Sequence, residues 1–419
     1  MKTVIFDFND FLKLFNFNRT ISYDDFCKKL SILNISDTTG QFVVRSDIDT
    51  FIQRVAKKDN RASRLDQYKK NLYRMLVQEP EVALRAWFKR YGELPHDLNY
   101  YFDIPTDSIR TGDTFQGIKN SKYGRVSKNI NFDKFYNTKK LYDNDSEYTF
   151  GLLKAMFEDF KIRNSLAGPA FFDHICRIED DDYNQFWTDF MIGANRASIF
   201  NPATYRGILD ELFEGDTIFA PVMGWNAYQF GFYSSTKFKK FIATDVIPEV
   251  VANGTLLHNS FQAYRDQSIF ELDDKTIDLY YCPSEELQNR HKFVDKYKNS
   301  VDAILFSPPY YDLEIYDSDD QSFTNYPDYN DWLKGYWEET IKICEQVLKP
   351  GGRLGFVISN YRNKAKEEVT ISEDMKAVVD RHLTNIGRYK VQWSAISTGR
   401  QAAKMKGGNF EDLWLFEKQ

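Results

Sequence analysis

The sequence of 419 residues is poor in cysteine, proline and glycine, and it has no long uninterrupted apolar run. Its four cysteines lie far apart with no CxxC pair, which excludes a disulfide scaffold and a cysteine-rich zinc site and fits a reducing cytoplasm. With 21 glycines, 12 prolines and 16% aromatic residues, the chain is neither collagen-like nor disordered. No window approaches ~20 consecutive apolar residues, so no membrane span is expected. Asp7 and Asp10 interrupt the first apolar stretch, which argues against a signal peptide.

The side chains that commonly bind metals are also sparse. No metal-ligand spacing is found among the five histidines, so no metal site is expected: His96, His174, His258, His291 and His382. The pair Glu285-Glu286 is interpreted as the start of a helix rather than as a catalytic dyad.

Charge is divided unevenly along a chain whose net charge is −6. Residues 1–150 carry a net charge of +5, residues 51–140 carry +9, and residues 151–419 carry −11. Such asymmetry marks either a solvated basic face or a nucleic-acid contact surface. Residues 106–140 favour the second interpretation, because cations that neutralise phosphates alternate there with aromatic rings that stack on bases. The predicted DNA contacts are Lys119, Lys122, Arg125 and Lys128, with Arg400 and Lys404 in a later basic loop.

Two parts of the chain differ in their hydrophobic pattern. Residues 1–145 are predicted to form a basic, mainly helical N-terminal domain, irregular over residues 96–145. Residues 146–419 are predicted to form a second domain with its core at 196–419, where short apolar strands alternate with helices. That alternation predicts an α/β fold with a mostly parallel sheet covered on both faces. The last two strands predict a hairpin at the edge of the sheet, and Ser372 is expected as a helix N-cap.

The sharpest motif is Ser307-Pro308-Pro309-Tyr310, which directly follows the apolar strand predicted over residues 301–306. Two consecutive prolines cannot continue a central strand or a helix interior, so they fix a loop at the carboxyl end of this strand. Open α/β sheets bind ligands at that end of their strands. The polar groups of Ser307 could there hold an amino group while the Tyr310 ring stacks on a flat base. A plain turn is the alternative.

This motif resembles the signature of the S-adenosylmethionine-dependent DNA amino-methyltransferases, in which Ser, Asn or Asp precedes Pro-Pro and then Tyr or Phe after the fourth strand. These enzymes methylate N4 of cytosine or N6 of adenine. The resemblance covers about residues 196–419. It implies a Rossmann-like class I methyltransferase sheet, mostly parallel with an antiparallel C-terminal hairpin strand. It also implies catalytic roles for Ser307, Pro308, Pro309 and Tyr310.

The same resemblance implies residues that bind S-adenosylmethionine. Residues 220–226 resemble the family's Asp-Pro-Phe-Xaa-Gly-Xaa-Gly loop, although Ala220 replaces the acidic residue and Asn226 replaces the second glycine. Asp245 ends the predicted second strand, where an acidic residue bonds the ribose hydroxyls of a nucleoside; a helix N-cap is its other interpretation. The predicted cofactor-binding residues are Asn201, Pro202, Pro221, Met223, Gly224, Trp225, Asn226, Asp245, Val246, Ser284 and Ser307. Glu411 is expected to be structural.

The predicted function is methyl transfer to the amino group of a base flipped out of a DNA duplex, which is DNA modification of the kind found in restriction–modification systems. The serine of the motif favours N4 of cytosine over N6 of adenine, and residues 1–145 would recognise the target. Two alternatives stay open. One is a methyltransferase that acts on RNA or on free nucleotides. The other is a non-enzymatic DNA-binding protein with a degenerate methyltransferase fold, which the departures at Ala220 and Asn226 favour.

Overall fold

The chain divides into two compact units, one formed by residues 1–93 and 132–196 and the other by residues 94–131 and 197–419. The computed structural model describes residues 4–6, 22–25, 42–44, 65–74, 78, 98, 102, 109–116, 130–131, 199–268, 274–312, 320–362, 368–392 and 410–419. The first unit holds helix α4 (Leu65–Tyr73) and an antiparallel pair of strands, β1 (Val4–Phe6) and β2 (Phe42–Val44). Most of the expected helical N-terminal domain lies outside the described residues, so its helical content stays a prediction.

The second unit is built around a nine-stranded sheet with the order β3-β4-β12-β13-β9-β8-β5-β6-β7. The strands are β3 (Ile109–Thr111), β4 (Thr114–Gln116), β5 (Thr217–Ala220), β6 (Lys240–Asp245), β7 (Thr276–Tyr281), β8 (Val301–Phe306), β9 (Leu348–Ile358), β12 (Thr384–Gln392) and β13 (Phe410–Glu417). Strands β5 to β9 all run parallel to one another. Strand β13 lies between β9 and β12 and runs antiparallel to both. Numbered from β5, the seven strands from β7 to β12 follow the order 3-2-1-4-5-7-6 with the seventh reversed. This order confirms the expected Rossmann-like class I methyltransferase sheet.

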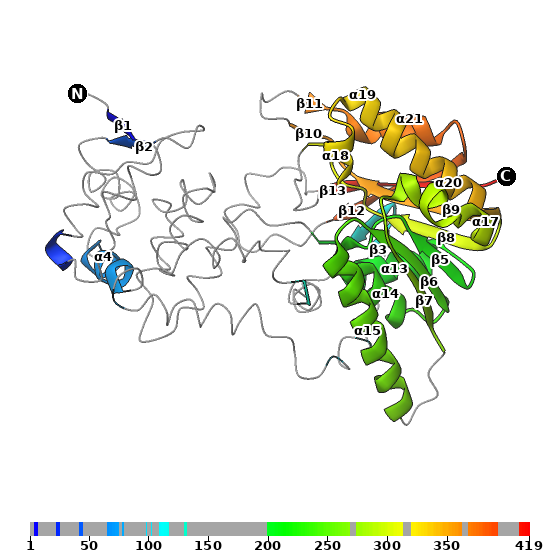
Figure 1. Cartoon of the computed structure of the whole chain (residues 1–419), viewed down its shortest axis with the longest axis horizontal. Coiled ribbons are helices and arrows are strands. Elements are labelled where there is room, and N and C mark those ends of the chain that lie inside the picture. The colour runs from blue at the N-terminus through cyan, green and yellow to red at the C-terminus, as the bar shows by residue number, and fades with distance from the viewer. Residues whose placement is uncertain are drawn as a thin grey trace. The chain divides into compact units, whose positions relative to one another are not determined.

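Helices cover both faces of this sheet (Figure 1). One group is α13 (Pro202–Leu212), α14 (Ala227–Ser234) and α15 (Pro248–Gln267), drawn in green. The other includes α17 (Phe293–Tyr297), α20 (Glu339–Val347) and α21 (Ile371–Val379). Strands β5 and β8 are buried almost throughout, as expected of parallel strands between two helical layers. The remaining short elements are η4 (Gly224–Asn226), η5 (Ser284–Glu286), α16 (Leu287–His291), α18 (Ser322–Asn325), α19 (Tyr329–Trp332), η6 (Leu333–Glu338), β10 (Tyr361–Arg362) and β11 (Glu368–Val369).

Two local expectations are wrong. Ser372 is not an N-cap, because it is the second residue of α21, which begins at Ile371 and has Thr370 as its N-cap. The Ser372 hydroxyl instead accepts a hydrogen bond from Trp414 Nε1 at 2.9 Å, which ties α21 to β13. The hairpin of β12 and β13 exists but is not the edge of the sheet, since β4 pairs with β12 in parallel and β3 extends the sheet further.

The two added strands lie within residues 96–145, which are predicted from the sequence to be irregular and to belong to the N-terminal domain. Residues 94–131 belong to the unit of the sheet. Phe115 on β4 is fully buried and packs edge-to-face on Tyr389 of β12, and the Arg110 guanidinium lies over the Tyr389 ring at 4.9 Å. Arg110 also pairs with Glu211 of α13 at 3.1 Å, so the strand pair is attached to the helical layer as well.

Nowhere in the described ranges does a helix have both the length and the apolar character that crossing a bilayer requires.

Candidate active site at the carboxyl edge of the sheet

The predicted motifs follow the carboxyl ends of parallel strands and therefore meet at one edge of the sheet. The 220–226 loop follows β5, Asp245 ends β6, residues 282–284 follow β7, and the Pro-Pro loop follows β8. Contacts between side chains connect these loops further.

The Pro-Pro loop is attached to the helices that surround the first strand. The Ser307 amide donates to Tyr228 Oη at 2.9 Å. Tyr228 stacks on Tyr205 with ring centroids 4.5 Å apart, and Tyr205 Oη donates to the Leu305 carbonyl at 2.9 Å. Phe200, which precedes the predicted cofactor-binding residues Asn201 and Pro202, packs edge-to-face on both tyrosine rings. A stack of aromatic rings thus fixes where β8 ends and the loop begins.

The residues of the Ser-Pro-Pro-Tyr motif differ in their exposure to solvent. Pro308 is buried, whereas Ser307 and Pro309 are partly exposed. Within the part of the chain that the structure describes, Ser307 Oγ makes no hydrogen bond, so its donor and both of its lone pairs are available to a ligand.

Tyr310 is held through its hydroxyl. The hydroxyl donates to Glu411 Oε1 at 2.8 Å and accepts from the Ser359 amide at 3.0 Å, and the ring packs edge-to-face on Tyr361. Burial, followed by the charge of Glu411, raises the pKa of Tyr310 above its usual range. The side chain is only 9% exposed, which fixes the ring and leaves little of it open. No local pattern in the sequence indicates the bond to Glu411, which lies 101 residues away.

The 220–226 loop has an unusual backbone. Gly224, Trp225 and Asn226 follow one another with φ values of 52°, 56° and 63°, all in the left-handed region. A Cβ atom on Gly224 would lie 2.5 Å from Cζ of Tyr228, so the glycine is also required by close packing. Asparagine tolerates this conformation, but tryptophan rarely adopts it. Strained backbone of this kind concentrates at functional sites, which makes the loop a candidate site in its own right.

Asp245 faces the same loop. Its Oδ2 accepts a hydrogen bond from the Met223 amide at 3.2 Å, and its Oδ1 accepts one from the Ile247 amide at 3.0 Å. Burial raises the pKa of this carboxyl to about 6, against the opposing effect of the backbone hydrogen bonds from Ile247, Met223 and Val246. A carboxylate has about four acceptor positions, so further donors can still bind here.

The remaining predicted cofactor-binding residues have mainly structural contacts. Asn201 is the N-cap of α13, with its Oδ1 accepting from the Ala203 amide at 2.9 Å, and Pro202 is the buried first residue of that helix. Pro221 is buried and Val246 is partly exposed. Ser284 is buried, with its Oγ 2.9 Å from Thr340 Oγ1.

The pair Glu285-Glu286 does begin helical structure, as expected, at the junction of η5 and α16. Glu285 is buried, however, and its burial raises the pKa of its carboxyl to about 7. No pattern in the sequence indicates this, because burial of a charged side chain depends on the packing of α20 and η6 against η5.

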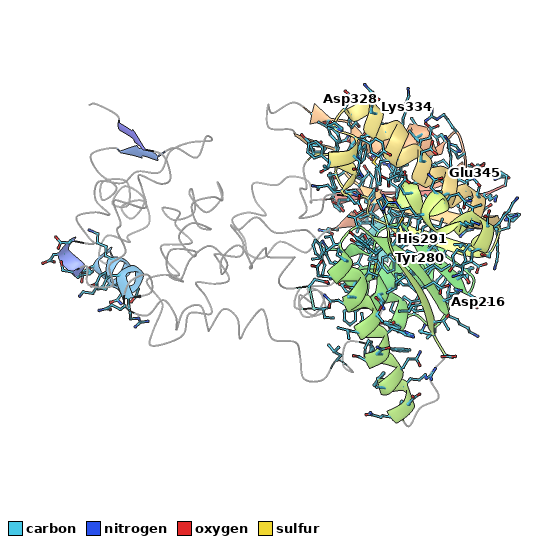
Figure 2. The ribbon with its side chains drawn as sticks, in the orientation of Figure 1. Asp216, Tyr280, His291, Asp328, Lys334 and Glu345 are labelled. Atoms are coloured by element: carbon cyan, nitrogen blue, oxygen red, sulfur yellow. The ribbon has the colours of Figure 1, made fainter. Side chains whose placement is uncertain are left out.

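The described histidines have partners other than metal ligands. His258 Nδ1 lies 2.9 Å from Tyr233 Oη, and His382 Nδ1 lies 2.9 Å from Glu345 Oε2. His291 packs edge-to-face on Tyr280, with ring centroids 5.1 Å apart, and both residues are labelled in Figure 2. Among the residues that the structure describes, no three His, Cys, Asp or Glu side chains are grouped as a metal site would require.

The predicted DNA contacts lie outside the described residues: Lys119, Lys122, Arg125, Lys128, Arg400 and Lys404. The described residues that flank them are informative, because Gln116 and Gln392 end the parallel strands β4 and β12 at the carboxyl edge. Asn131, at the other end of the first basic segment, bonds to Trp225 and Asn226 in the loop after β5.

No protein-family profile and no curated protein matches the sequence. Among solved structures, the chain is similar to the N-methyltransferase NodS from Bradyrhizobium japonicum WM9 in complex with S-adenosyl-L-homocysteine, with 15% identity, a TM-score of 0.29, and 50% of this chain and 81% of that chain covered. An rRNA methylase from Streptococcus thermophilus has 20% identity and a TM-score of 0.29, with 53% and 99% covered.

A candidate DNA modification methylase from Thermus thermophilus, complexed with S-adenosyl-L-methionine, has 17% identity and a TM-score of 0.24. The match covers 32% of this chain and 53% of that chain, about half of its length. Likenesses of this strength carry no argument about activity, and the fold assignment depends on the strand order of the sheet itself.

Proposed function

We propose that the protein is an S-adenosylmethionine-dependent methyltransferase that modifies an exocyclic amino group of a base in DNA, with N4 of cytosine favoured over N6 of adenine. The observation that carries the proposal is the hydrogen bond from the Ser307 amide to Tyr228 Oη. Tyr228 lies against Gly224, so this bond holds the Ser-Pro-Pro-Tyr loop beside the left-handed loop and Asp245.

The residues present fit the cofactor. Asp245 retains acceptor positions for ribose hydroxyls, and the left-handed loop of Gly224 to Asn226 turns its backbone tightly beside that carboxylate. We assign cofactor contacts to the loop residues Pro221, Met223, Gly224, Trp225 and Asn226, to Asp245 and Val246, and to Asn201, Pro202, Ser284 and Ser307. The bound cofactor supplies a methyl group activated by its positive sulfur.

Ser307 and Pro308 would hold the amino group of the target base. The lone pair of this nitrogen is delocalised into the base ring, which makes it a weak nucleophile. Hydrogen bonds from both N–H groups to Ser307 Oγ and to the Pro308 carbonyl would favour a pyramidal nitrogen with its lone pair free. Catalysis would then come mainly from position and orientation, with the nitrogen losing its proton after it gains the methyl group.

Tyr310 and Pro309 would form the wall against which the base rests. Because the Tyr310 hydroxyl is fixed by Glu411 and Ser359, the ring would meet the base in one orientation only. A duplex covers its amino groups by pairing and stacking, so the base would be flipped out before it reaches this wall. The basic segments with Lys119, Lys122, Arg125 and Lys128 and with Arg400 and Lys404 would bind the DNA backbone, which is supported by their flanking residues at the carboxyl edge.

Mass spectrometry of nucleosides tests this function directly. DNA, RNA and free nucleotides are incubated separately with the protein and S-adenosylmethionine, and the nucleosides obtained from each are analysed for methylated bases. The expected product is N4-methylcytosine in DNA. Finding N6-methyladenine in DNA instead would keep the proposed activity and show that the target base is adenine. Methylation confined to RNA or to free nucleotides would establish the first alternative. Binding to DNA with no cofactor binding in calorimetry would establish a degenerate fold.

A further inference from the structure

The side chain of Asn131 is buried against the left-handed loop. Its Nδ2 donates to the Trp225 carbonyl at 3.1 Å and to Asn226 Oδ1 at 2.8 Å, so both of its N–H groups bond to the loop. Its Oδ1 accepts from Asn253 Nδ2 at 3.1 Å, and Asn253 also donates to the Ile130 carbonyl at 2.9 Å. One amide therefore joins the loop after β5 to helix α15.

Further amides extend this connection inside the fold. Asn226 Nδ2 donates to the Val250 carbonyl at 3.1 Å and lies 3.4 Å from Gln229 Oε1. Gln229 Nε2 donates to the Gly254 carbonyl at 2.8 Å and to Tyr233 Oη at 2.9 Å. A buried polar network is stable only when its members are satisfied, so the loss of one amide affects the neighbouring groups as well.

The loop needs such support because of its conformation. Two successive residues with side chains, Trp225 and Asn226, have positive φ values, which L-residues adopt at a cost in free energy. The Asn131 amide bonds to one acceptor on each of these two residues. Without it, the buried Trp225 carbonyl and Asn226 Oδ1 would each lose a donor, and the favoured right-handed conformation would become easier to reach.

We infer that Asn131 is a positioning residue that holds Gly224, Trp225 and Asn226 in the shape that binds the cofactor. The inference depends on the proposed function, since it concerns the same cofactor loop. Asn131 would act through the loop, because its two N–H groups bond to Trp225 and Asn226 and its Oδ1 bonds to Asn253. Residues 94–131 thereby contribute to the cofactor site as well as to the edge of the sheet.

Calorimetric titration of S-adenosylmethionine into single variants tests this role. Asn131→Ala removes both hydrogen bonds donated to the loop and is expected to weaken binding about tenfold. Asn131→Asp keeps nearly the same shape, but its carboxylate has no hydrogen to donate to the Trp225 carbonyl and Asn226 Oδ1. It should therefore bind S-adenosylmethionine no better than Asn131→Ala. The matched control is Asn385→Ala, which removes the bond from Asn385 Nδ2 to the Leu415 carbonyl far from the loop and should leave affinity unchanged. The melting temperature of each variant without ligand shows that it is folded.

A double-mutant cycle with Asn226→Gly separates positioning from general stability. Glycine adopts a positive φ freely, so Asn131→Ala in the Asn226→Gly protein should weaken binding less than about threefold. Additive losses, or a lower melting temperature with unchanged affinity, would overturn the positioning role and leave the proposed function intact. Failure of the unmodified protein to bind S-adenosylmethionine would overturn both.

Discussion

At the scale of single residues, the candidate site combines fixed and available groups. Tyr310 is held at its hydroxyl by Glu411 and Ser359, whereas Ser307 Oγ makes no hydrogen bond in the described part of the chain. An anchored ring beside an available hydroxyl suits the recognition of a flat, polar base. The ring of Tyr310 and its hydroxyl can be tested separately.

Tyr310→Ala is expected to lower kcat for methyl transfer by at least about 100-fold, because the base loses the surface that orients it. The dissociation constant for S-adenosylmethionine should stay nearly unchanged, since Asp245 and the loop after β5 are untouched. Tyr310→Phe is the matched control, because it keeps the ring and removes only the bonds to Glu411 and Ser359; a loss of about tenfold is expected. Steady-state kinetics and calorimetry measure both quantities, and equal losses of kcat and cofactor affinity in Tyr310→Ala would contradict the assigned role.

The raised pKa of Asp245 leads us to expect that cofactor binding depends on pH. Its pKa is about 6 in the folded protein against an ordinary value of 3.8, so the charged carboxylate destabilises the unliganded fold, and stability falls as pH rises through this interval. In the proposed complex, ribose hydroxyls would donate to the carboxylate and lower its pKa, so binding should weaken about tenfold as pH falls from about 7 to about 5. Calorimetry across this range measures the effect.

Two variants serve as controls for that measurement. Asp245→Asn should remove the pH dependence together with much of the affinity, because an amide does not titrate. Glu285→Gln should retain the dependence below about pH 6, which separates Asp245 from the Glu285 carboxyl with its pKa of about 7. A dependence that persists in Asp245→Asn would exclude this carboxylate as its origin.

At the scale of elements, the strand pair β3–β4 is the least expected part of the fold. It joins the sheet beside β12 and buries Phe115 completely. Three-residue strands of this kind are hardly visible in sequence, because period-two alternation cannot be recognised over so few residues. Their pairing depends on a partner, β12, that lies more than 250 residues further along the chain.

Phe115→Ala is expected to lower the free energy of unfolding by about 3 to 5 kcal/mol, the cost of removing a buried phenylalanine from a packed core. Phe410→Ala is the matched control on β13, where the ring is 36% exposed, and it should cost less than about 1 kcal/mol. Urea denaturation followed by tryptophan fluorescence measures both values. Equal effects would show that β3 and β4 contribute no more to the core than an exposed position does.

At the scale of the whole molecule, a protein of net charge −6 is proposed to bind a polyanion. The net charge of +9 over residues 51–140 makes this possible, provided that the basic residues face the DNA together. Counterions released from DNA then dominate the salt dependence of binding.

Replacing Lys119, Lys122, Arg125 and Lys128 with glutamine should reduce the slope of log K against log salt by about 3 to 4, since each phosphate contact contributes about 0.9. Fluorescence anisotropy of labelled DNA between about 50 and 200 mM salt gives the slope. Lys342→Gln is the control, because Lys342 pairs with Glu339 on the surface of α20 at 2.7 Å and should leave the slope unchanged. An unaltered slope in the fourfold variant would remove this segment from the DNA contact.

The sequence by itself predicted that strands alternate with helices over residues 196–419, and it predicted the motifs that follow β5, β6, β7 and β8. Apolar runs, prolines and glycines act locally, and a parallel sheet brings the carboxyl ends of its strands to one edge whatever the details of packing. Only the tertiary structure decided that Glu411 meets Tyr310, that Asn131 meets Asn226 across 95 residues, and that β4 extends the sheet beyond β12. These contacts join segments far apart in the chain, and their free energy depends on burial and hydrogen-bond partners that exist only once the layers are packed.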